Sequence, residues 1–291
     1  MNTAYSVAPA ATSSSANLHE LGQRGRIVID DLHKVFPSAA GDVVALGAVN
    51  LTIHEGEFLC LVGPSGCGKT TVLRTLAGLE RQTSGTIRST IEAGGRPMSS
   101  MVFQGHGVFP WMTVLDNAAF GLAARGVDKA ERYRIARDYL ARLGLDAFEK
   151  AYPRQLSGGM LQRVNLARAF ANDPAILLMD EPFGALDEQT KILAYEDLLQ
   201  LWEGTKKTVV FITHNLDEAI ILGDRVAVIG RRPGRVKDIV DVKLPRPRNV
   251  LDMQNDKEYV EIRRRIWDSL REEVLSLRHE MNAEMRRGVP A

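Results

Sequence analysis

A glycine-rich octapeptide between an apolar run and a helical segment constrains the fold of this chain more than any other feature. Residues 63–70 read GPSGCGKT and fit the pattern G-x-x-x-x-G-K-[ST] in full. The preceding run, Phe58–Val62, is wholly apolar and stops at a glycine, so we expect a buried parallel strand. A helix is expected from Lys69 to about Ala77. Glycines let backbone N–H groups turn inward around an anion, and a helix start adds donors and a positive dipole end. The sequence therefore predicts a phosphate-binding loop.

The positions of this loop can be given chemical roles. Lys69 is expected to reach the β- and γ-phosphates of a nucleotide, and the Thr70 hydroxyl is expected to ligate Mg²⁺. Thr71 is expected to donate to the α-phosphate. The loop alone does not identify one class of enzyme: the chain lacks the Asn-Lys-x-Asp tetrapeptide of a GTPase, but a small-molecule kinase remains compatible with it. The cofactor-binding candidates of this segment are Gly63, Pro64, Ser65, Gly66, Cys67, Gly68, Lys69, Thr70 and Thr71.

Two adjacent acids follow a second apolar run. Residues 176–179 predict a buried strand, and Asp180 and Glu181 come at its carboxyl end. Two carboxylates at the end of a buried strand are costly unless a cation lies nearby. We expect Asp180 to hold Mg²⁺ through water and Glu181 to polarise the water that attacks the γ-phosphate.

Strands and helices alternate along most of the chain, which favours a parallel sheet covered by helices on both faces. Two amino-terminal strands should form an antiparallel layer, with a turn around residues 38–42. The block from 105 to 160 is helical and is expected to be an insertion. The predicted fold class is therefore α/β, a P-loop NTPase core with a parallel sheet, an antiparallel β layer and an inserted helical subdomain. The expected strands are Arg26–Leu32, Asn50–His54, Phe58–Val62, Met101–Phe103, Ile176–Met179, Val209–Ile212 and Arg225–Ile229, and the expected helices of the insertion are Thr113–Ala124 and Lys129–Leu143.

The two ends of the chain differ in character. Residues 1–25 are small and polar, without a basic start or an apolar h-region, so we expect a disordered leader and no secretory signal. From Tyr259 to Met281 apolar residues recur every three or four positions, which predicts one long amphipathic helix that either packs on the domain or binds a partner. The expected organisation is a leader at 1–25, a core at 26–104 and 161–240, the helical subdomain at 105–160 and a carboxyl-terminal extension at 241–291.

Composition excludes some classes of function. The formal net charge is +1, so no overall field indicates a nucleic-acid partner. The two cysteines, Cys60 and Cys67, do not form a disulfide framework, which favours a reducing compartment. No apolar stretch approaches the roughly 18 residues that a membrane-spanning helix needs.

One further segment resembles a feature of a known family. Residues 156–160, LSGGM, followed by Gln162-Arg163-Val164, resemble the signature loop of ABC-transporter ATPases. The other motifs of that family are present in order, and the resemblance covers residues 26–240. It departs from the family at Met160, where glutamine is common, and at Gly184, where serine is common.

The resemblance implies roles for four more residues. Phe36 matches the aromatic residue that stacks on adenine, and Gln104 looks like the Q-loop glutamine, expected near Mg²⁺ and the attacking water. Asp187 belongs to a segment, ALD, that looks like the D-loop. His214 looks like the switch histidine that contacts the γ-phosphate. The implied activity is hydrolysis of ATP with Mg²⁺, with Lys69, Gln104, Glu181 and His214 as the catalytic candidates.

A second glycine-rich helix start has a distinct implication. Ser157, Gly158 and Gly159 would form another anion-binding helix N-terminus. One triphosphate does not need two such sites. In the family that the chain resembles, the second is offered to the ATP of a partner, so two ATP molecules lie between two head-to-tail copies. A second copy of this chain is therefore the first partner that the resemblance implies.

Three segments resemble one importer group in particular. Residues 109–117, 182–187 and 233–235 look like those of ATPases that drive nitrate, sulfonate and taurine import. The resemblance implies two membrane-spanning permease subunits, indirectly a solute-binding protein, and a peripheral place on the cytoplasmic face of the inner (plasma) membrane. Trp111 is expected either to line the groove that receives a permease helix or to pack within the helical insertion.

The main alternative is a soluble ABC-type ATPase that is not coupled to transport. Such proteins in DNA repair or chromosome structure carry long coiled coils between the two glycine loops, but residues 71–156 show no sustained heptads. Translation-type members carry two ATPase domains in one chain, and Glu181 argues against a non-hydrolytic regulator.

Overall fold

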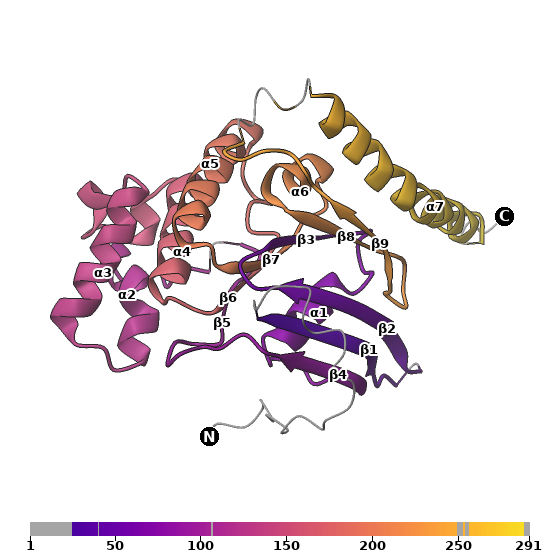
Figure 1. Ribbon diagram of the computed structural model, residues 1–291, viewed down its shortest axis with the longest axis horizontal. Helices are drawn as coiled ribbons and strands as arrows, with labels where there is room; N and C mark the ends of the chain where they lie inside the picture. The colour runs from indigo at the N-terminus through magenta and orange to yellow at the C-terminus, as the bar shows by residue number, and fades with distance from the viewer. Residues whose placement is uncertain (1–24, 40, 106, 249–252, 254–255, 288–291) are drawn as a thin grey trace, which may run out of the picture.

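Two β-sheets and a block of helices make up the protein (Figure 1). The computed structural model describes residues 25–39, 41–105, 107–248, 253 and 256–287, with the backbone alone described at 274 and 276–287. The expected leader at 1–25 lies, apart from residue 25, outside the described residues. The fold class is the predicted one, α/β with a parallel sheet and an antiparallel layer.

The larger sheet has six strands in the order β5-β6-β7-β3-β8-β9. The first five are parallel, as predicted, and the β3 residues Phe58–Val62 are all buried near its centre. The edge strand β9 runs antiparallel to β8 and was not predicted, because its VKDIVD sequence is mostly half-exposed and lacks an apolar run. The strands are β3 Phe58–Val62, β5 Ser99–Val102, β6 Ile176–Asp180, β7 Thr208–Ile212, β8 Arg225–Ile229 and β9 Val236–Asp241.

The smaller sheet is antiparallel, in the order β2-β1-β4. Its strands are longer than predicted: β1 is Arg26–Phe36 and β2 is Val43–His54. Register shifts in their pairing, and positive φ angles at Asp31 (48°) and Ala48 (59°), interrupt the alternation that marks a strand in sequence. The third strand, β4 (Ser84–Ser89), was missed because it is short and polar.

The central sheet separates two hydrophobic cores. Alternate residues of β3 face opposite sides: Phe58 and Cys60 join the core beneath the helical block, whereas Leu59 and Leu61 join the core shared with the antiparallel sheet. Helix α1 (Lys69–Leu76) also packs in the second core through Val72 and Leu73. The two elements that flank the phosphate-binding loop, β3 before it and α1 after it, are thus both anchored in the hydrophobic core.

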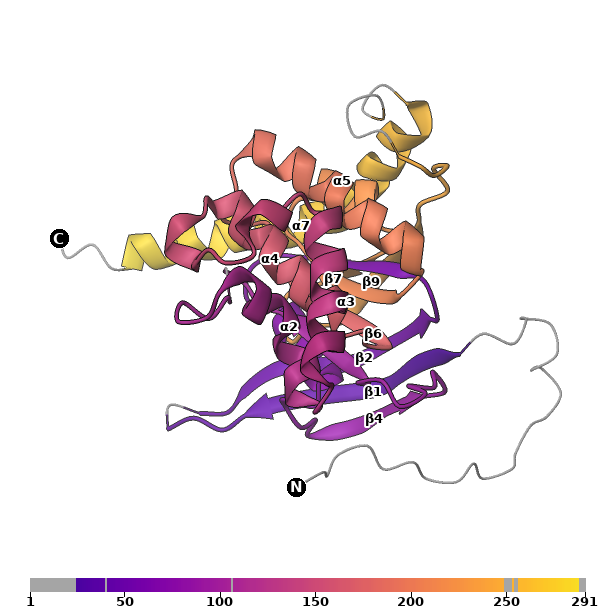
Figure 2. The ribbon, with the colours of Figure 1, turned by 90° about the vertical axis from the view of Figure 1, so that its left-hand side faces the viewer.

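The helical block lies to one side of the central sheet, and it contains the two predicted helices (Figures 1 and 2). Thr113, Asp128 and Ser157 cap three of its helices through their side chains. Two further helices, α5 and α6, cover the central sheet in the same core. The helices are α2 Val114–Ala124, α3 Lys129–Arg142, α4 Gly158–Ala171, α5 Glu188–Thr205 and α6 Leu216–Leu222.

The expected amphipathic helix is present as α7, Lys257–Arg287. Figure 1 shows it on the side of the molecule away from α2 and α3. Its first four turns bury an apolar face against the domain, formed by Tyr259, Ile262, Ile266 and Leu270. Within the described residues, no helix has both the length and the apolar character required to cross a bilayer.

Candidate active site

The phosphate-binding loop has the local geometry that its sequence predicts. Gly68 precedes α1 with φ of 101°, and Gly66 has φ of 75°, conformations that other residues rarely adopt. A Cβ atom on Gly63 would lie 2.4 Å from the Ile229 carbonyl oxygen, so only glycine fits between β3 and β8. The loop therefore depends on glycine for its turns and for its close approach to β8.

Lys69 and Thr70 occupy the start of α1. The Lys69 side chain is folded over the loop, where its Nζ donates to the carbonyl oxygens of Gly63 (2.7 Å) and Pro64 (3.0 Å). The Thr70 hydroxyl donates to Asp180 Oδ1 at 3.1 Å. The structure thus brings together the hydroxyl and the carboxylate that the sequence assigns to one Mg²⁺ ion.

Parallel strands place the remaining catalytic candidates at one edge of the sheet. β5, β6, β7 and β3 are successive parallel neighbours, so the residues after each strand meet at the same edge. Gln104 follows β5, Glu181 follows β6 and His214 follows β7. The phosphate-binding loop at 63–70 follows β3, so the topology brings these four parts of the chain into one site.

Glu181 is the centre of a small polar cluster. Its Oε2 accepts from Gln104 Nε2 at 3.4 Å and lies 3.2 Å from His214 Nδ1. The Glu181 backbone has φ of 45°, which is uncommon for a residue other than glycine and is typical of functional sites. Glu181 therefore has both the neighbours and the strained backbone of a residue aimed at a reaction centre.

Burial adjusts the acid–base properties of this edge. It raises the pKa of the Asp180 carboxyl above its ordinary value, and the nearby Glu181 charge adds to the rise.

Among the described residues no group of three or more His, Cys, Asp or Glu side chains could hold a metal ion. The Thr70 and Asp180 oxygens fit Mg²⁺, which usually takes only one or two protein ligands and completes its shell with phosphates and water.

The signature-loop residues form a second group, built on α4 and α5. Ser157 caps α4 by accepting from the Met160 amide at 3.3 Å, and Asp187 caps α5 by accepting from the Thr190 amide at 3.0 Å. A Cβ atom on Gly159 would lie 2.7 Å from Thr190 Cγ2. The signature and D-loop helices therefore meet at their first turns.

Phe36 belongs to neither group. It is the last residue of β1, opposite Val43 on the antiparallel sheet, and the Lys34 ammonium lies 4.6 Å from the centroid of its ring. Among the described residues, Phe36 makes no direct hydrogen bond or ring contact with the polar cluster around Glu181. Its expected role as the adenine platform stays a prediction.

Sequence reasoning missed two arginines beside the phosphate-binding loop. Arg231 and Arg232 line a cavity of about 280 Å³ together with residues 64–67. They follow β8, whose carboxyl end lies beside that of β3, as the parallel pairing shows. Two adjacent cations one residue after an apolar strand were the signal available in the sequence.

A buried acid also lies beneath His214. Glu218 is only 6% exposed and accepts a hydrogen bond from the Thr213 hydroxyl. The Thr213 hydroxyl in turn accepts from the Asn215 amide at 2.9 Å. Burial raises the pKa of Glu218 from 4.5 to about 7. Thr213 and Asn215, on either side of His214, are therefore hydrogen-bonded in a chain that ends at the Glu218 carboxyl group, whose ionised form is disfavoured by burial.

We expect Glu218→Gln to remove a pH dependence of stability. The unfolded chain releases the Glu218 proton near pH 4.5, but the folded chain keeps it until about pH 7. The free energy of unfolding of the wild type should therefore fall by up to about 3 kcal/mol as the pH rises from 4.5 to about 7. Above pH 7 this group should cause no further fall. Melting temperatures at pH 5 and pH 8 should show the variant gaining on the wild type at the higher pH. Glu196→Gln, at an exposed position of α5, is the control, and a gap that is equal at both pH values would contradict the prediction.

Comparison with known proteins gives consistent matches. A family model described as "ABC transporter" matches residues 46–184. The ABC transporter ATP-binding protein MJ0412 of Methanocaldococcus jannaschii, itself described as uncharacterized, is 47% identical over 253 residues, 86% of this chain and 93% of the relative. The nitrate import ATP-binding protein NrtD of Synechocystis sp. is 48% identical over 219 residues, 75% of this chain and 82% of the relative. The aliphatic sulfonates import ATP-binding protein SsuB of Bacillus cereus is 39% identical over 242 residues, 82% of this chain and 94% of the relative.

Solved structures agree with these relatives. The dimeric structure of MJ0796, a bacterial ABC transporter cassette, superposes with a TM-score of 0.65 at 33% identity. It covers 75% of this chain and 100% of its own. A second dimeric structure of MJ0796, in a post-hydrolysis state bound to ADP and Pi, matches equally well at 32% identity. From these matches and the geometry of its two glycine loops, the chain belongs to the ABC transporter family as one of its ATP-binding cassettes.

Proposed function

We propose that this ATPase drives a membrane importer and works as a pair of copies, with each ATP held between loop 63–70 of one copy and residues 157–159 of the other. The observation that carries the proposal is the place of the second anion-binding helix start. Within this chain Gly159 packs against Thr190 of α5, and the catalytic cluster is built around Glu181 without it. A second copy, related by a two-fold axis, would bring the two halves together twice.

The proposed chemistry assigns one task to each residue of the cluster. Glu181 polarises the attacking water, and Gln104 and His214 hold its carboxylate in place through Oε2. Lys69 moves from the Gly63 and Pro64 carbonyls to the β- and γ-phosphates. His214 also contacts the γ-phosphate.

Metal and base binding complete the proposed nucleotide site. Thr70, Asp180 and Gln104 are the residues that would hold Mg²⁺, which would neutralise charge that develops on the phosphates. Such a cation would also offset the burial that raises the pKa of Asp180. Phe36 would stack on the adenine.

The proposed cargo is nitrate, an aliphatic sulfonate or taurine. Support comes from the relatives named for nitrate and aliphatic sulfonate import, which are 48% and 39% identical to this chain. The proposed partners are a second copy, two permease subunits and, indirectly, a solute-binding protein, but no nucleic acid. The chain would lie peripherally on the cytoplasmic face of the plasma membrane.

An exposed aromatic cluster supports the proposed permease contact. Trp111 is 69% exposed, and its ring lies 5.4 Å from that of Phe109, which in turn lies 4.6 Å from Phe120. The Arg168 guanidinium lies 5.3 Å from the Phe109 ring. Exposed aromatic residues and arginine are enriched where proteins bind each other. This cluster is the proposed seat of a short permease helix.

Replacing Trp111 by alanine is expected to uncouple transport from hydrolysis. Removing an exposed anchor should weaken permease binding by at least about tenfold, because such residues dominate interface energies. Growth of the source organism on nitrate, an alkanesulfonate or taurine as sole nitrogen or sulfur source should fail in a gene deletion. Complementation with Trp111→Ala should not restore it, although the purified variant keeps its ATPase rate.

The matched control for this test is Trp267→Ala, a change at the other strongly exposed tryptophan of the described chain. It should complement the deletion. If the deletion strain grows normally on all three solutes, the proposed cargo is wrong. If the chain also fails to co-purify with co-expressed permease subunits, the alternative of a soluble ABC-type ATPase is favoured.

A further inference from the structure

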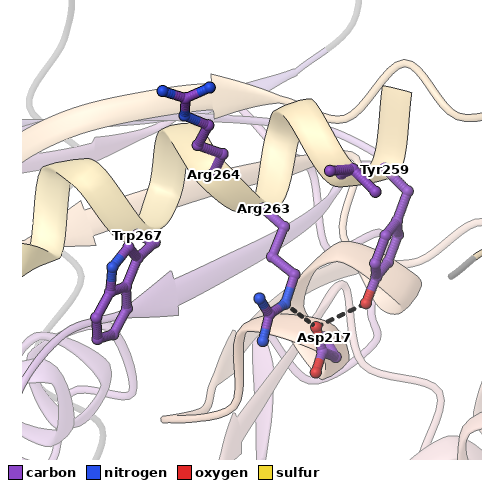
Figure 3. Close-up of a pocket in the computed structure, with 6 residues that line it drawn as sticks. Asp217, Tyr259, Arg263, Arg264 and Trp267 are labelled. Atoms are coloured by element: carbon purple, nitrogen blue, oxygen red, sulfur yellow. Dashed lines mark hydrogen bonds and ion pairs between the residues drawn. The ribbon is translucent and has the colours of Figure 1, made fainter. Parts of the chain in front are cut away.

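Besides its apolar packing, helix α7 makes two hydrogen bonds to one carboxylate of α6, that of Asp217. Figure 3 shows Tyr259 and Arg263, both on α7, pointing at Asp217 in the first turn of α6. The Tyr259 hydroxyl donates to Asp217 Oδ1 at 2.6 Å, and Arg263 Nε donates to the same oxygen at 2.7 Å. A surface pocket of about 440 Å³ lies beside this contact and is lined by Asp217, Tyr259, Val260, Arg263, Arg264 and Trp267.

Asp217 is only three residues from His214, and the turn between them is held by its own hydrogen bonds. Asn215 Oδ1 accepts from the amides of Asp217 (2.9 Å) and Glu218 (3.3 Å), which starts α6. The Asn215 amide donates to Thr213 Oγ1 at 2.9 Å. A shift of Asp217 would therefore move Asn215 and, with it, the backbone of His214.

The same turn is held from the inside by a different element. Glu218 accepts from the Thr213 hydroxyl in a buried position, so this side of the turn is fixed by the core. The Asp217 carboxylate faces outward and accepts hydrogen bonds from Tyr259 and Arg263 of α7. The position of the turn is thus shared between the core and α7.

A later turn of α7 also lies beside the active site. Glu273 of α7 accepts from the Arg231 amide at 3.1 Å, and Lys237 pairs with Glu273 at 3.3 Å. Arg231 lines the cavity next to the phosphate-binding loop. Between these ends Ile266 is completely buried. One helix therefore contacts both the turn that follows His214, through Asp217, and the rim of the phosphate-binding loop, through Arg231.

We propose that α7 is a positioning element for His214, and that Tyr259 and Arg263 are positioning residues that act through Asp217. This inference rests on the proposed role of His214 in hydrolysis. Movement of α7 away from α6 would release Asp217 and leave His214 less well placed for the γ-phosphate. The carboxyl-terminal extension would then set the turnover rate without touching the nucleotide.

The test is the double variant Tyr259→Phe/Arg263→Gln in the full chain. It removes both donors to Asp217 but keeps the packing of the ring, so we expect kcat for ATP to fall about three- to tenfold. The KM for ATP should not change, because the phosphate-binding loop is not altered. The melting temperature should fall only slightly, because the Arg263–Asp217 pair is partly exposed and the one further hydrogen bond lost, from the Tyr259 hydroxyl, has a modest net effect on stability. Tyr259→Phe/Arg263→Lys should lose less of the kcat than the double variant with glutamine, since an ammonium at position 263 can still reach Asp217.

Two comparisons separate this inference from a general loss of structure. Arg264→Gln removes the same charge from the next position of α7, where the guanidinium faces Asp268 at 3.8 Å, and it should leave kcat unchanged. In a His214→Ala background the double variant should cause no further loss, because both changes act on one group. An additional three- to tenfold loss in that background, or a wild-type kcat in the double variant, would overturn the inference. A wild-type kcat in His214→Ala itself would instead overturn the proposed role of His214.

Discussion

Changing Glu181 to glutamine will leave ATP binding intact and lower kcat by about 10²–10⁴-fold, the range that positioned general bases contribute. The glutamine amide has nearly the same shape, so the contacts with Gln104 and His214 can persist. It cannot take a proton from the attacking water. Phosphate release in single-turnover experiments measures the loss, and size-exclusion chromatography with ATP should show the variant accumulating as a dimer.

A neighbouring acid gives the control for this experiment. Glu188 lies in the first turn of α5 and is well exposed, with Lys191 at 2.9 Å. Glu188→Gln removes one charge near the site and should hydrolyse ATP at close to the wild-type rate. Wild-type turnover in Glu181→Gln would show that another group activates the water, even with the family assignment unchanged.

The second large effect is expected at Ser157. Ser157→Arg should keep the affinity of the isolated chain for nucleotide, because loop 63–70 is unchanged, but should reduce hydrolysis by about 10²–10³-fold. The arginine would fill the position from which the helix start of α4 would face the ATP of the second copy. Loss of the cap at Ser157 also costs about 1 kcal/mol, which is not enough to unfold a domain of this size.

Two measurements interpret the Ser157 result. Asp128→Arg removes the cap of another helix in the same block, α3, and should change the melting temperature by a similar amount while preserving hydrolysis. Mixing Ser157→Arg with an excess of Lys69→Ala chains should restore activity, because each mixed pair then has one composite site, made of an unchanged loop 63–70 from one chain and unchanged residues 157–159 from the other. Full turnover by Ser157→Arg alone would contradict the shared site.

The parts of the fold that sequence reasoning predicted are those where local pattern and packing agree. Phe58–Val62 is apolar at every position and is buried at every position in the structure. The phosphate-binding loop could be assigned because its glycines meet a local requirement for positive φ. Local signals of this kind do not depend on which other elements pack nearby.

The missed features depend on partners that are distant in sequence. β4 pairs with β1 across more than 50 residues of chain, and its alternation is polar, so it shows no apolar period. The Arg231 cavity forms only because β8 lies beside β3. The hydrogen bonds to Asp217 come from Tyr259 and Arg263, which lie 42 and 46 residues further along the chain. A tyrosine and an arginine on a helix are ordinary in a sequence and do not indicate such a contact. The strained φ of Glu181 likewise follows from its tertiary setting.

The close approach of Gly159 to Thr190 makes the first turns of α4 and α5 a single mechanical unit. An added methyl group on Gly159 would clash with Thr190, so the two turns pack directly against each other with no side chain between them at this point. In the proposed pair, Asp187 must then travel with Ser157 whenever the helical block rotates toward the other copy. Binding of one nucleotide would then move the helix starts at Ser157 and Asp187 together. The two ATP sites of the pair would therefore open and close at the same time.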